Sequence, residues 1–475
     1  MTATVLHSDA LVVGAGSAGA IVAERLSLDP ACAVTVLEAG VGLADPALAE
    51  QAADGSRLPI GPASRLVRRY RADLVDGSAG ALTIVRGATL GGSGAVNGGY
   101  FCRGRPGDFD TGVPGWSWPE LLESFRAVET DLDFAGPQHG TTGPIPVRRT
   151  REMCDGTGQF IDTAVRGGFV WNDDLNDATT PQSGVGAVPL NIVDGVRTGP
   201  GAAYLLPALG RPNLTVFTET RAVRVDIERD CAVAVDAVGP QGPIRLTAKR
   251  IILCAGAIES AHLLMLSGIG DEVMLRDAGI EVRSTLPVGT RCADHPEWLV
   301  PAAWPGTPGR PALEAVLHTE KLEIRPYTNG FTAMVGDAGA AEPPQIGVAL
   351  MTPLARGRVT LVSADPAVPP RIEHRYDTEP DDVAQLRRGV ELVSELLGVK
   401  HQAAPPRWST SQHLCGTAPM GTDGDETAVL DPQCRVRGIE GLWVVDGSVL
   451  PRATSRGPHA SIAMLAHRAT ELLRS

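Results

Sequence analysis

Two sets of residues in this chain have side chains and positions that are typical of functional sites. Near the N-terminus, Gly14, Gly16 and Gly19 stand in the spacing G-x-G-x-x-G, and the acid Glu38 follows them. Near the C-terminus, His413 stands among glycines in the run SQHLCGTAPMG. The first set is typical of a dinucleotide site. The second offers an imidazole that can exchange a proton near neutral pH.

The segments around the first three glycines indicate whether these glycines form a cofactor site or an ordinary turn. Residues 10–13 predict a buried parallel strand, 20–26 a helix, and 34–37 a second strand that ends at Glu38. A helix N-terminus offers free N–H groups and a positive dipole end to phosphates, and the acid can accept hydrogen bonds from ribose hydroxyls. The alternative is a strand–helix–strand turn without a ligand. The complete order of strand, glycines, helix, strand and acid favours the cofactor.

A second glycine-rich segment, residues 84–104, reads IVRGATLGGSGAVNGGYFCRG. Six glycines fall between Gly87 and Gly99, which is more than an ordinary helix or strand tolerates. We therefore expect a close-packed loop whose backbone approaches a flat or charged group.

The composition excludes several classes of protein. The chain has 475 residues, which suits two domains, and its net charge of −13 argues against binding nucleic acid through its phosphates. The eight cysteines show no C-x-x-C, zinc or haem-attachment spacing, which predicts reduced cysteines in a cytoplasmic protein. A cofactor strand is expected within ten residues of the first Met, and no apolar run reaches transmembrane length. We therefore expect neither a signal peptide nor a transmembrane segment.

The rest of the chain alternates between helical and strand-like patterns. Helices are expected at 116–129, 257–266, 381–397 and 460–473, and strands at 214–228, 232–238, 244–253, 357–363 and 442–451, with an extended segment from residue 143. Residues 296–355 are proline-rich and are expected to be irregular.

Together, these motifs resemble the glucose–methanol–choline (GMC) family of FAD-dependent oxidoreductases over nearly the whole chain. Residues 84–104 resemble the family's first signature and 256–270 its second, although Ala261 stands where the family usually has proline. The run LPVGTRCADHP at 286–296 is similar to the segment that follows. Residues 357–382 resemble part of the substrate-domain sheet. HLCGTAPMG and LWVVDGSVLP resemble the C-terminal catalytic region.

The resemblance implies that FAD is bound noncovalently. Some family members attach FAD through a histidine just before the position of Asn97, and Val96 stands there in this chain. The backbone of Val223 is implied to contact the adenine. Asp446 is implied to lie near the ribityl-pyrophosphate, although a turn carboxylate at a strand end is the alternative. The implied cofactor-binding residues are Gly14, Gly16, Ser17, Ala18, Gly19, Glu38, Ala39, Arg86, Leu90, Gly91, Gly92, Ser93, Asn97, Gly98, Val223, Ala255, Gly256, Asp446, Gly447, His459 and Ala460.

The resemblance also implies a catalytic pair. The run from His413 matches the family's H-x-x-G-T-x-x-M-G, so His413 is implied to take the hydroxyl proton while the carbinol hydride goes to flavin N5. The alternative is an ordinary surface histidine. The family places Asn or His in the turn before the last helix. Gly457 falls where Asn is common, so we expect His459 to be the second hydrogen-bonding group. The helix that follows would favour negative charge at the flavin N1–C2 region. We expect His262, His295 and His467 to be structural.

The expected fold is α/β, with a Rossmann-like FAD-binding domain and a second α+β substrate domain built on an antiparallel sheet. Residues 1–140, 191–295 and 425–475 are assigned to the first domain, and 141–190 and 296–424 to the second. The expected reaction is oxidation of a small-molecule or cofactor-derived alcohol, with electrons passed to a non-oxygen acceptor, for which the respiratory chain is one candidate. Overall likeness and length suggest the mycofactocin-associated branch. An oxidase that makes hydrogen peroxide, a flavin-containing lyase, and a nicotinamide enzyme or non-catalytic binder are the alternatives.

Overall fold

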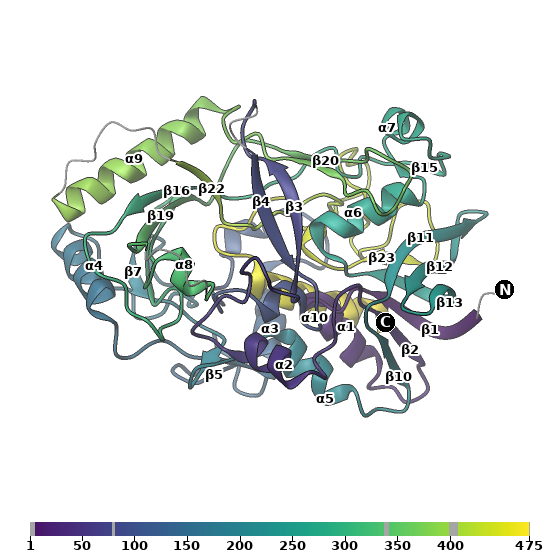
Figure 1. The fold of residues 1–475 in the computed structure, drawn as a ribbon, viewed down its shortest axis with the longest axis horizontal. Helices are drawn as coiled ribbons and strands as arrows, with labels where there is room; N and C mark the ends of the chain where they lie inside the picture. The colour runs from purple at the N-terminus through teal and green to yellow at the C-terminus, as the bar shows by residue number, and fades with distance from the viewer. Residues whose placement is uncertain (1–4, 78–80, 337–341, 399–406, 475) are drawn as a thin grey trace.

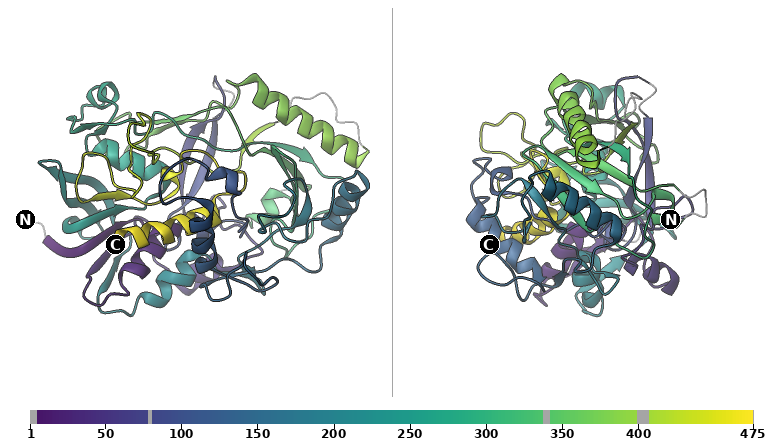
Figure 2. Two further views of the ribbon diagram at one scale, coloured as in Figure 1. Left: turned by 180° about the vertical axis from the view of Figure 1, so that it is seen from behind. Right: turned by 90° about the vertical axis from the view of Figure 1, so that its left-hand side faces the viewer.

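In the computed structural model, which describes residues 5–77, 81–336, 342–398 and 407–474, two large sheets anchor the two halves of the molecule. Figure 1 shows the half with β1, β2 and β13 at the right and the half with α9 and α4 at the left. Figure 2 shows the same two halves from behind and from one side.

The first sheet joins strands from distant parts of the chain. β1 (Val5–Val13) pairs in parallel with β2 (Val34–Leu37) on one side and with β13 (Gly242–Leu253) on the other. The strand order is β10 (Leu214–Phe217), β2, β1, β13, β12 (Cys231–Gly239) and β11 (Arg221–Glu228), with β23 (Leu442–Val444) parallel to the end of β13. The middle strands are apolar runs because both faces of a parallel sheet are covered.

Helices cover this sheet and lead into the loops at its edge. α1 (Ser17–Leu26) packs on β1 and β2, and α10 (His459–Arg474) packs on α1 and on α3 (Trp118–Val128). α10 begins toward the middle of the molecule (Figure 2). The other helices of the first half are α2 (Pro46–Ala53), α5 (Leu206–Ala208), α6 (Gly256–Leu266) and α7 (Glu272–Asp277).

The second sheet is antiparallel, and it corrects one expectation. Residues 296–355 are not irregular, because they supply four of its strands. Three of their prolines, Pro296, Pro301 and Pro326, lie at strand ends, where a missing N–H does little harm. The order is β22 (Arg407–Thr410), β16 (Pro296–Pro301), β19 (Gln345–Leu350), β18 (Leu322–Pro326), β17 (Ala315–His318) and β7 (Gly184–Ala187). α9 (Pro380–Leu397) and α4 (Asp155–Arg166) pack on this sheet.

A third sheet corrects a second expectation. Residues 357–382 do not join the six-stranded sheet. Their strands β20 (Arg358–Thr360) and β21 (Arg371–Glu373) pair instead with β3 (Val67–Asp73) and β4 (Ala81–Gly87). β3 and β4 stand between the two halves in Figure 1. The remaining short elements are β5 (Glu129–Asp131), β6 (Ile145–Val147), β8 (Ile192–Val193), β9 (Val196–Arg197), β14 (Ile269–Gly270), β15 (Ser284–Thr285) and α8 (Phe331–Met334).

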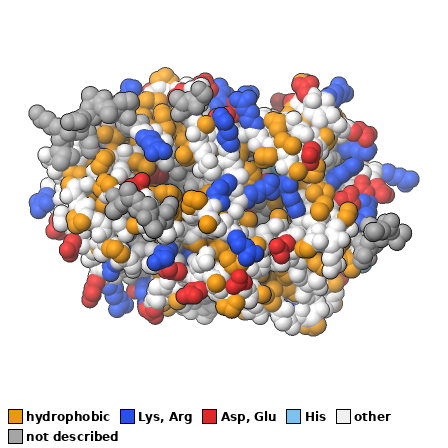
Figure 3. Space-filling view, viewed as in Figure 1, with side chains coloured by type: hydrophobic (Ala, Val, Ile, Leu, Met, Phe, Trp, Pro, Cys, Tyr) orange, Lys and Arg blue, Asp and Glu red, His pale blue; other side chains and the backbone are white. Residues whose placement is uncertain are grey.

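The predicted fold class is confirmed: a Rossmann-like sheet is joined to a half built on an antiparallel sheet. The assignment of residues to two domains stays a prediction. The eight cysteines are free, and only Cys231 is not buried. In the part of the chain that is described, no helix has both the length and the apolar character needed to cross a bilayer. Lys and Arg side chains gather over the middle of the face in Figure 3, where Figure 1 places β3 and β4.

Candidate active site

The first glycine loop lies where β1 and β13 end side by side. Gly14 has φ +101°, and a methyl group there would lie 2.6 Å from the carbonyl oxygen of Cys254. A methyl group on Gly19 would lie 1.9 Å from the carbonyl oxygen of Gly14. Both positions therefore require glycine. α1 begins at Ser17, and no acid occupies its first turn, so its N–H groups are open to an anion.

Glu38 joins the ends of the parallel strands. Its Oε2 accepts the backbone N–H of Ala15 at 2.9 Å, and its Oε1 accepts that of Gly40 at 2.7 Å. Burial raises the pKa of Glu38 to about 7, against the lowering effect of these two bonds. Each oxygen keeps a further lone pair, so ribose hydroxyls could donate to it. The neighbouring Ala39 is exposed.

The second glycine segment packs directly on the first. The N–H of Gly91 donates to the carbonyl of Ala15 at 2.8 Å. A methyl group on Gly92, where φ is +53°, would lie 2.7 Å from Cα of Gly16. Gly92–Ala95 forms one 3₁₀ turn within the loop. The close-packed glycine loop expected from the sequence is therefore present.

His459 and Asn97 meet beside this loop. Nδ2 of Asn97 lies 3.1 Å from Nδ1 of His459, and Phe101 packs edge-on against the imidazole. A methyl group on Gly94 would lie 2.5 Å from Oγ of Ser17 and 2.9 Å from Nε2 of His459. Burial lowers the pKa of His459 to about 4, so the ring is neutral at pH 7.

His413 lies in the loop that follows β22, and its ring meets that of His295. The two Nδ1 atoms are 2.8 Å apart, and the ring planes are nearly perpendicular. Burial, followed by the positive charges that His295 and Arg325 can carry, holds the pKa of His413 well below its usual range. His413 is therefore a neutral imidazole, as a proton acceptor must be.

The structure does not record a contact between the two histidines expected to form a catalytic pair. The residue next to His413 in the turn before α10 is Gly457. A methyl group on Gly457 would lie 3.4 Å from Cε1 of His413 and 3.0 Å from the ring of Tyr100. His459 instead contacts Asn97 beside the second glycine segment.

A buried charge network adjoins His413 on the six-stranded sheet. Arg325 pairs with Glu323 at 2.6 Å and with Glu297 at 3.3 Å, and it donates to Oγ of Ser411 at 2.6 Å. The hydroxyl of Tyr100 donates to Glu323 at 2.7 Å. Two buried carboxylates share one guanidinium in this network, which forms a polar wall beside His413.

The other expected cofactor residues lie at the edges of this region. Asp446 follows β23, and its Oδ2 accepts from the N–H of Gly256 at 2.8 Å and from the hydroxyl of Ser260 at 2.6 Å. Burial raises the pKa of Asp446, against the lowering effect of its hydrogen bonds. Val223 lies at a bulge in β11. Leu90, Ala18 and Ala460 are buried; Ser93, whose hydroxyl accepts the N–H of Gly87, is exposed.

Sequence reasoning missed three polar residues here. His295, which we expected to be structural, contacts His413. Oδ1 of Asp294 accepts the backbone N–H groups of both of these histidines. Asn191 is fully buried beside Gly99, and its amide has no hydrogen-bond partner among the described groups. The run DHP was the only signal for the first two. His262 and His467 lie next to Glu259 and Glu471, and their structural role stays a prediction.

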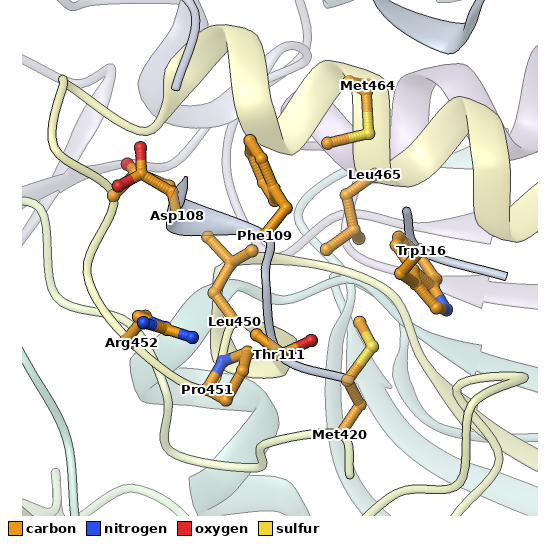
Figure 4. A pocket seen from close by; sticks show the side chains of 11 residues that line it. Asp108, Phe109, Thr111, Trp116, Met420, Leu450, Pro451, Arg452, Met464 and Leu465 are labelled. Carbon is orange, nitrogen blue, oxygen red and sulfur yellow. The ribbon is translucent and has the colours of Figure 1, made fainter. Parts of the chain in front are cut away.

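The residues at this site fit FAD. Nε2 of His459 and Nη2 of Arg86 are buried without a hydrogen-bond partner among the described groups. Nη2 of Arg86 could therefore donate to a polar cofactor, and Nε2 of His459 could donate to one or accept from it. The tight glycine loops bring backbone N–H groups together beside the open first turn of α1. A small pocket beside α10, drawn in Figure 4, is lined by Phe109, Trp116 and Leu450 among others and contains neither His413 nor His459.

Comparisons with known proteins show which family the chain resembles. A family model described as GMC oxidoreductase matches residues 8–297, and a second with the same description matches residues 353–466. A GMC-type oxidoreductase of Rhodococcus erythropolis is 39% identical over 98% of this chain and 98% of its own length. Pyridoxine 4-oxidase of Microbacterium luteolum is 32% identical over 97% and 98%. The structure of pyridoxine 4-oxidase from Mesorbium loti superimposes with a TM-score of 0.89 at 28% identity and covers 98% of each chain.

The fold and the site define a flavoprotein oxidoreductase. The chain belongs to the GMC oxidoreductase family, and its cofactor is FAD. The family resemblance seen in the sequence is therefore confirmed, whereas the mycofactocin-associated branch stays a proposal.

Proposed function

We propose that this enzyme oxidises the CH–OH group of a small alcohol with His413 as the general base. The observation that carries the proposal is the neutral His413 imidazole, which lies beside Gly457 in the turn that leads into the cofactor-side residue His459. Bound FAD supplies the hydride acceptor, noncovalently because Val96 offers no atom for attachment. His413 then receives the hydroxyl proton, which favours departure of the carbinol hydride.

The remaining residues prepare this step. Asn97 orients His459 through Nδ1 of the imidazole. The N-terminus of α10, which begins at His459, would favour negative charge on the bound cofactor. The charge network of Arg325, Glu323 and Glu297 forms a polar wall of the substrate domain beside His413. The cofactor-binding residues named above hold FAD in this proposal, and residues 141–190 and 296–424 form the substrate-binding domain.

We propose a non-oxygen electron acceptor, with a reduced mycofactocin-type cofactor as one substrate to test. An oxidase that forms hydrogen peroxide is the second candidate, because two similar proteins are named pyridoxine 4-oxidase. The lyase alternative predicts turnover without net flavin reduction.

An anaerobic absorbance titration tests these alternatives. The purified holoenzyme is mixed with pyridoxine, benzyl alcohol, choline and a reduced mycofactocin-type cofactor in turn. Bleaching of the flavin bands supports alcohol oxidation and identifies the substrate class. Rapid recolouring in air with stoichiometric peroxide supports an oxidase, and slow recolouring that a dye acceptor accelerates supports a dehydrogenase. His413→Ala should keep its FAD and lose flavin reduction by about 10²–10⁴-fold. Reduction at the wild-type rate would remove His413 from the base role.

A further inference from the structure

The contact between His295 and His413 follows from the pairing of two strands. β16 and β22 are antiparallel neighbours, with Pro296 opposite Thr410, so the residue before one strand lies beside the loop after the other. The N–H of Ser411 also donates to the carbonyl of His295 at 3.1 Å. His295 itself is fully buried. The backbone position of His295 is therefore fixed by sheet geometry.

The 2.8 Å separation of the two Nδ1 atoms requires one proton between them. Burial lowers the pKa of His295 to about 4, and the pKa of His413 is also well below its usual range. Each ring therefore carries a single N–H at neutral pH. Either His295 donates from Nδ1 and His413 accepts, or His413 donates and His295 accepts.

The proposed role of His413 requires the second arrangement. A base must present a bare nitrogen to the substrate, and Nδ1 of His413 is already engaged with His295. Nε2 is therefore the nitrogen of His413 that has to be bare, and the single proton of the ring then lies on Nδ1. His295 then carries its proton on Nε2 and accepts at Nδ1.

We propose that His295 is the positioning residue of His413: it accepts the Nδ1–H of His413 and so leaves Nε2 of His413 unprotonated and free to take the substrate proton. The proposal rests on the proposed function, in which His413 is the base. Gly457 has no side chain that could hold the ring, so the tautomer of His413 depends on His295. The bond also fixes the direction in which Nε2 points.

Three variants test this role. His295→Leu removes the acceptor at similar volume, and His295→Asn places an amide oxygen near the position of Nδ1. His374→Leu is the matched control: His374 is also buried and lies 3.4 Å from Asp294, but the structure records no contact between it and His413. With the alcohol that bleaches the wild type, His295→Leu should lower the limiting rate of flavin reduction by about 10²–10⁴-fold at little change in apparent Kd. His295→Asn should recover most of that loss.

A loss in His295→Leu no larger than in His374→Leu would overturn the proposal. If His413→Ala keeps full reduction, the base assignment itself fails. If only His413→Ala loses activity, the positioning role alone fails.

A second measurement needs neither substrate nor a folded His295 variant. In wild-type holoenzyme labelled with ¹⁵N-histidine, and assigned with His413→Gln, the shifts of His413 should report protonated Nδ1 and bare Nε2 at pH 7. Protonated Nε2 with bare Nδ1 would overturn the proposal, because His413 would then have no free lone pair toward the substrate.

Discussion

The backbone N–H of His413 donates to Oδ1 of Asp294 over 2.6 Å. The same oxygen accepts the N–H of His295 at 2.9 Å. The other oxygen, Oδ2, accepts the hydroxyls of Tyr376 and Thr410. One buried carboxylate thus fixes the loop that carries the proposed base.

Asp294→Asn should destabilise the protein by about 1–3 kcal/mol, because an amide nitrogen cannot accept the bonds that one carboxylate oxygen accepts. Burial acts to raise the pKa of Asp294, but His374 and the hydrogen bonds outweigh it and lower the pKa to about 2. The carboxylate is therefore ionised across the range of activity. Urea unfolding of the holoenzyme measures the loss, and an unchanged midpoint would show that the amide replaces all four bonds.

Gly457→Ala should lower the rate of flavin reduction by about 10- to 100-fold while FAD content is kept. The added methyl group would lie 3.0 Å from the Tyr100 ring and must displace that ring or the His413 loop. A displacement of about 1 Å at a reacting group can cost 10²-fold in rate. Stopped-flow reduction measures the effect. Gly158→Ala, where the methyl group meets nothing within 4 Å, is the control. Equal rates in both variants would show that the Gly457 contact is relaxed without cost.

Gly19→Ala should yield protein that retains little FAD. Its methyl group would lie 1.9 Å from the carbonyl oxygen of Gly14. To relieve this overlap, α1 must move away from the strand that leads into the glycine loop. The ratio of flavin to protein absorbance after gel filtration measures cofactor retention. Gly107→Ala, in open space, should retain a full complement. A fully loaded Gly19→Ala protein would contradict the close packing of α1.

Acid should destabilise the holoenzyme between pH 6.5 and about 4. The pKa values of His295, His318 and His459 are lowered by burial from 6.5 to about 4. The unfolded chain therefore takes up protons below pH 6.5 that the folded protein does not, and stability present above 6.5 is lost as the pH falls. Each unit of pKa shift corresponds to about 1.4 kcal/mol. Unfolding free energies from pH 8 to 4.5 measure this, and a flat profile would contradict neutral burial of these rings.

His139→Gln should lower stability by about 3–5 kcal/mol. Nε2 of His139 lies 2.7 Å from Asp174, and Nδ1 lies 3.2 Å from Asp131. Burial acts to lower the pKa of His139, but hydrogen bonds to these carboxylates raise it to about 11. Its charge therefore stabilises the fold below pH 6.5, and that stability is lost as the pH rises toward 11. Removing the charge leaves buried carboxylates short of a partner. Thermal unfolding at pH 7 measures the effect.

Secondary structure could be predicted where the order of apolar and polar residues within one segment is typical of a strand or a helix. Residues 10–13, 34–37 and 244–253 were expected as strands, and each lies within an observed strand. Residues 296–355 misled because proline density was interpreted as irregular structure, whereas prolines at strand ends are compatible with a sheet.

Sequence patterns identified His413 but not its neighbours. His295 and Asp294 lie 118 and 119 positions away from it, and nothing in a single sequence shows that β16 and β22 are adjacent. Pairing between strands that are distant in the chain depends on tertiary packing, which local patterns do not encode. The same reason explains why the sequence did not show that Gly457, and not His459, is the residue of the turn before α10 that lies next to His413.

Because β1 pairs with β13, and β13 pairs with β23, the first sheet can be completed only late in protein synthesis. A ribosome delivers β1, α1 and β2 long before residues 242–253 emerge, and the face of α1 that receives α10 stays uncovered until the last helix is released. Until then, the N-terminal segment exposes apolar surface and unpaired strand edges, which make a nascent chain prone to aggregate. Premature termination before residue 459 would release a product with an open flank on α1, a natural target for chaperones and proteases.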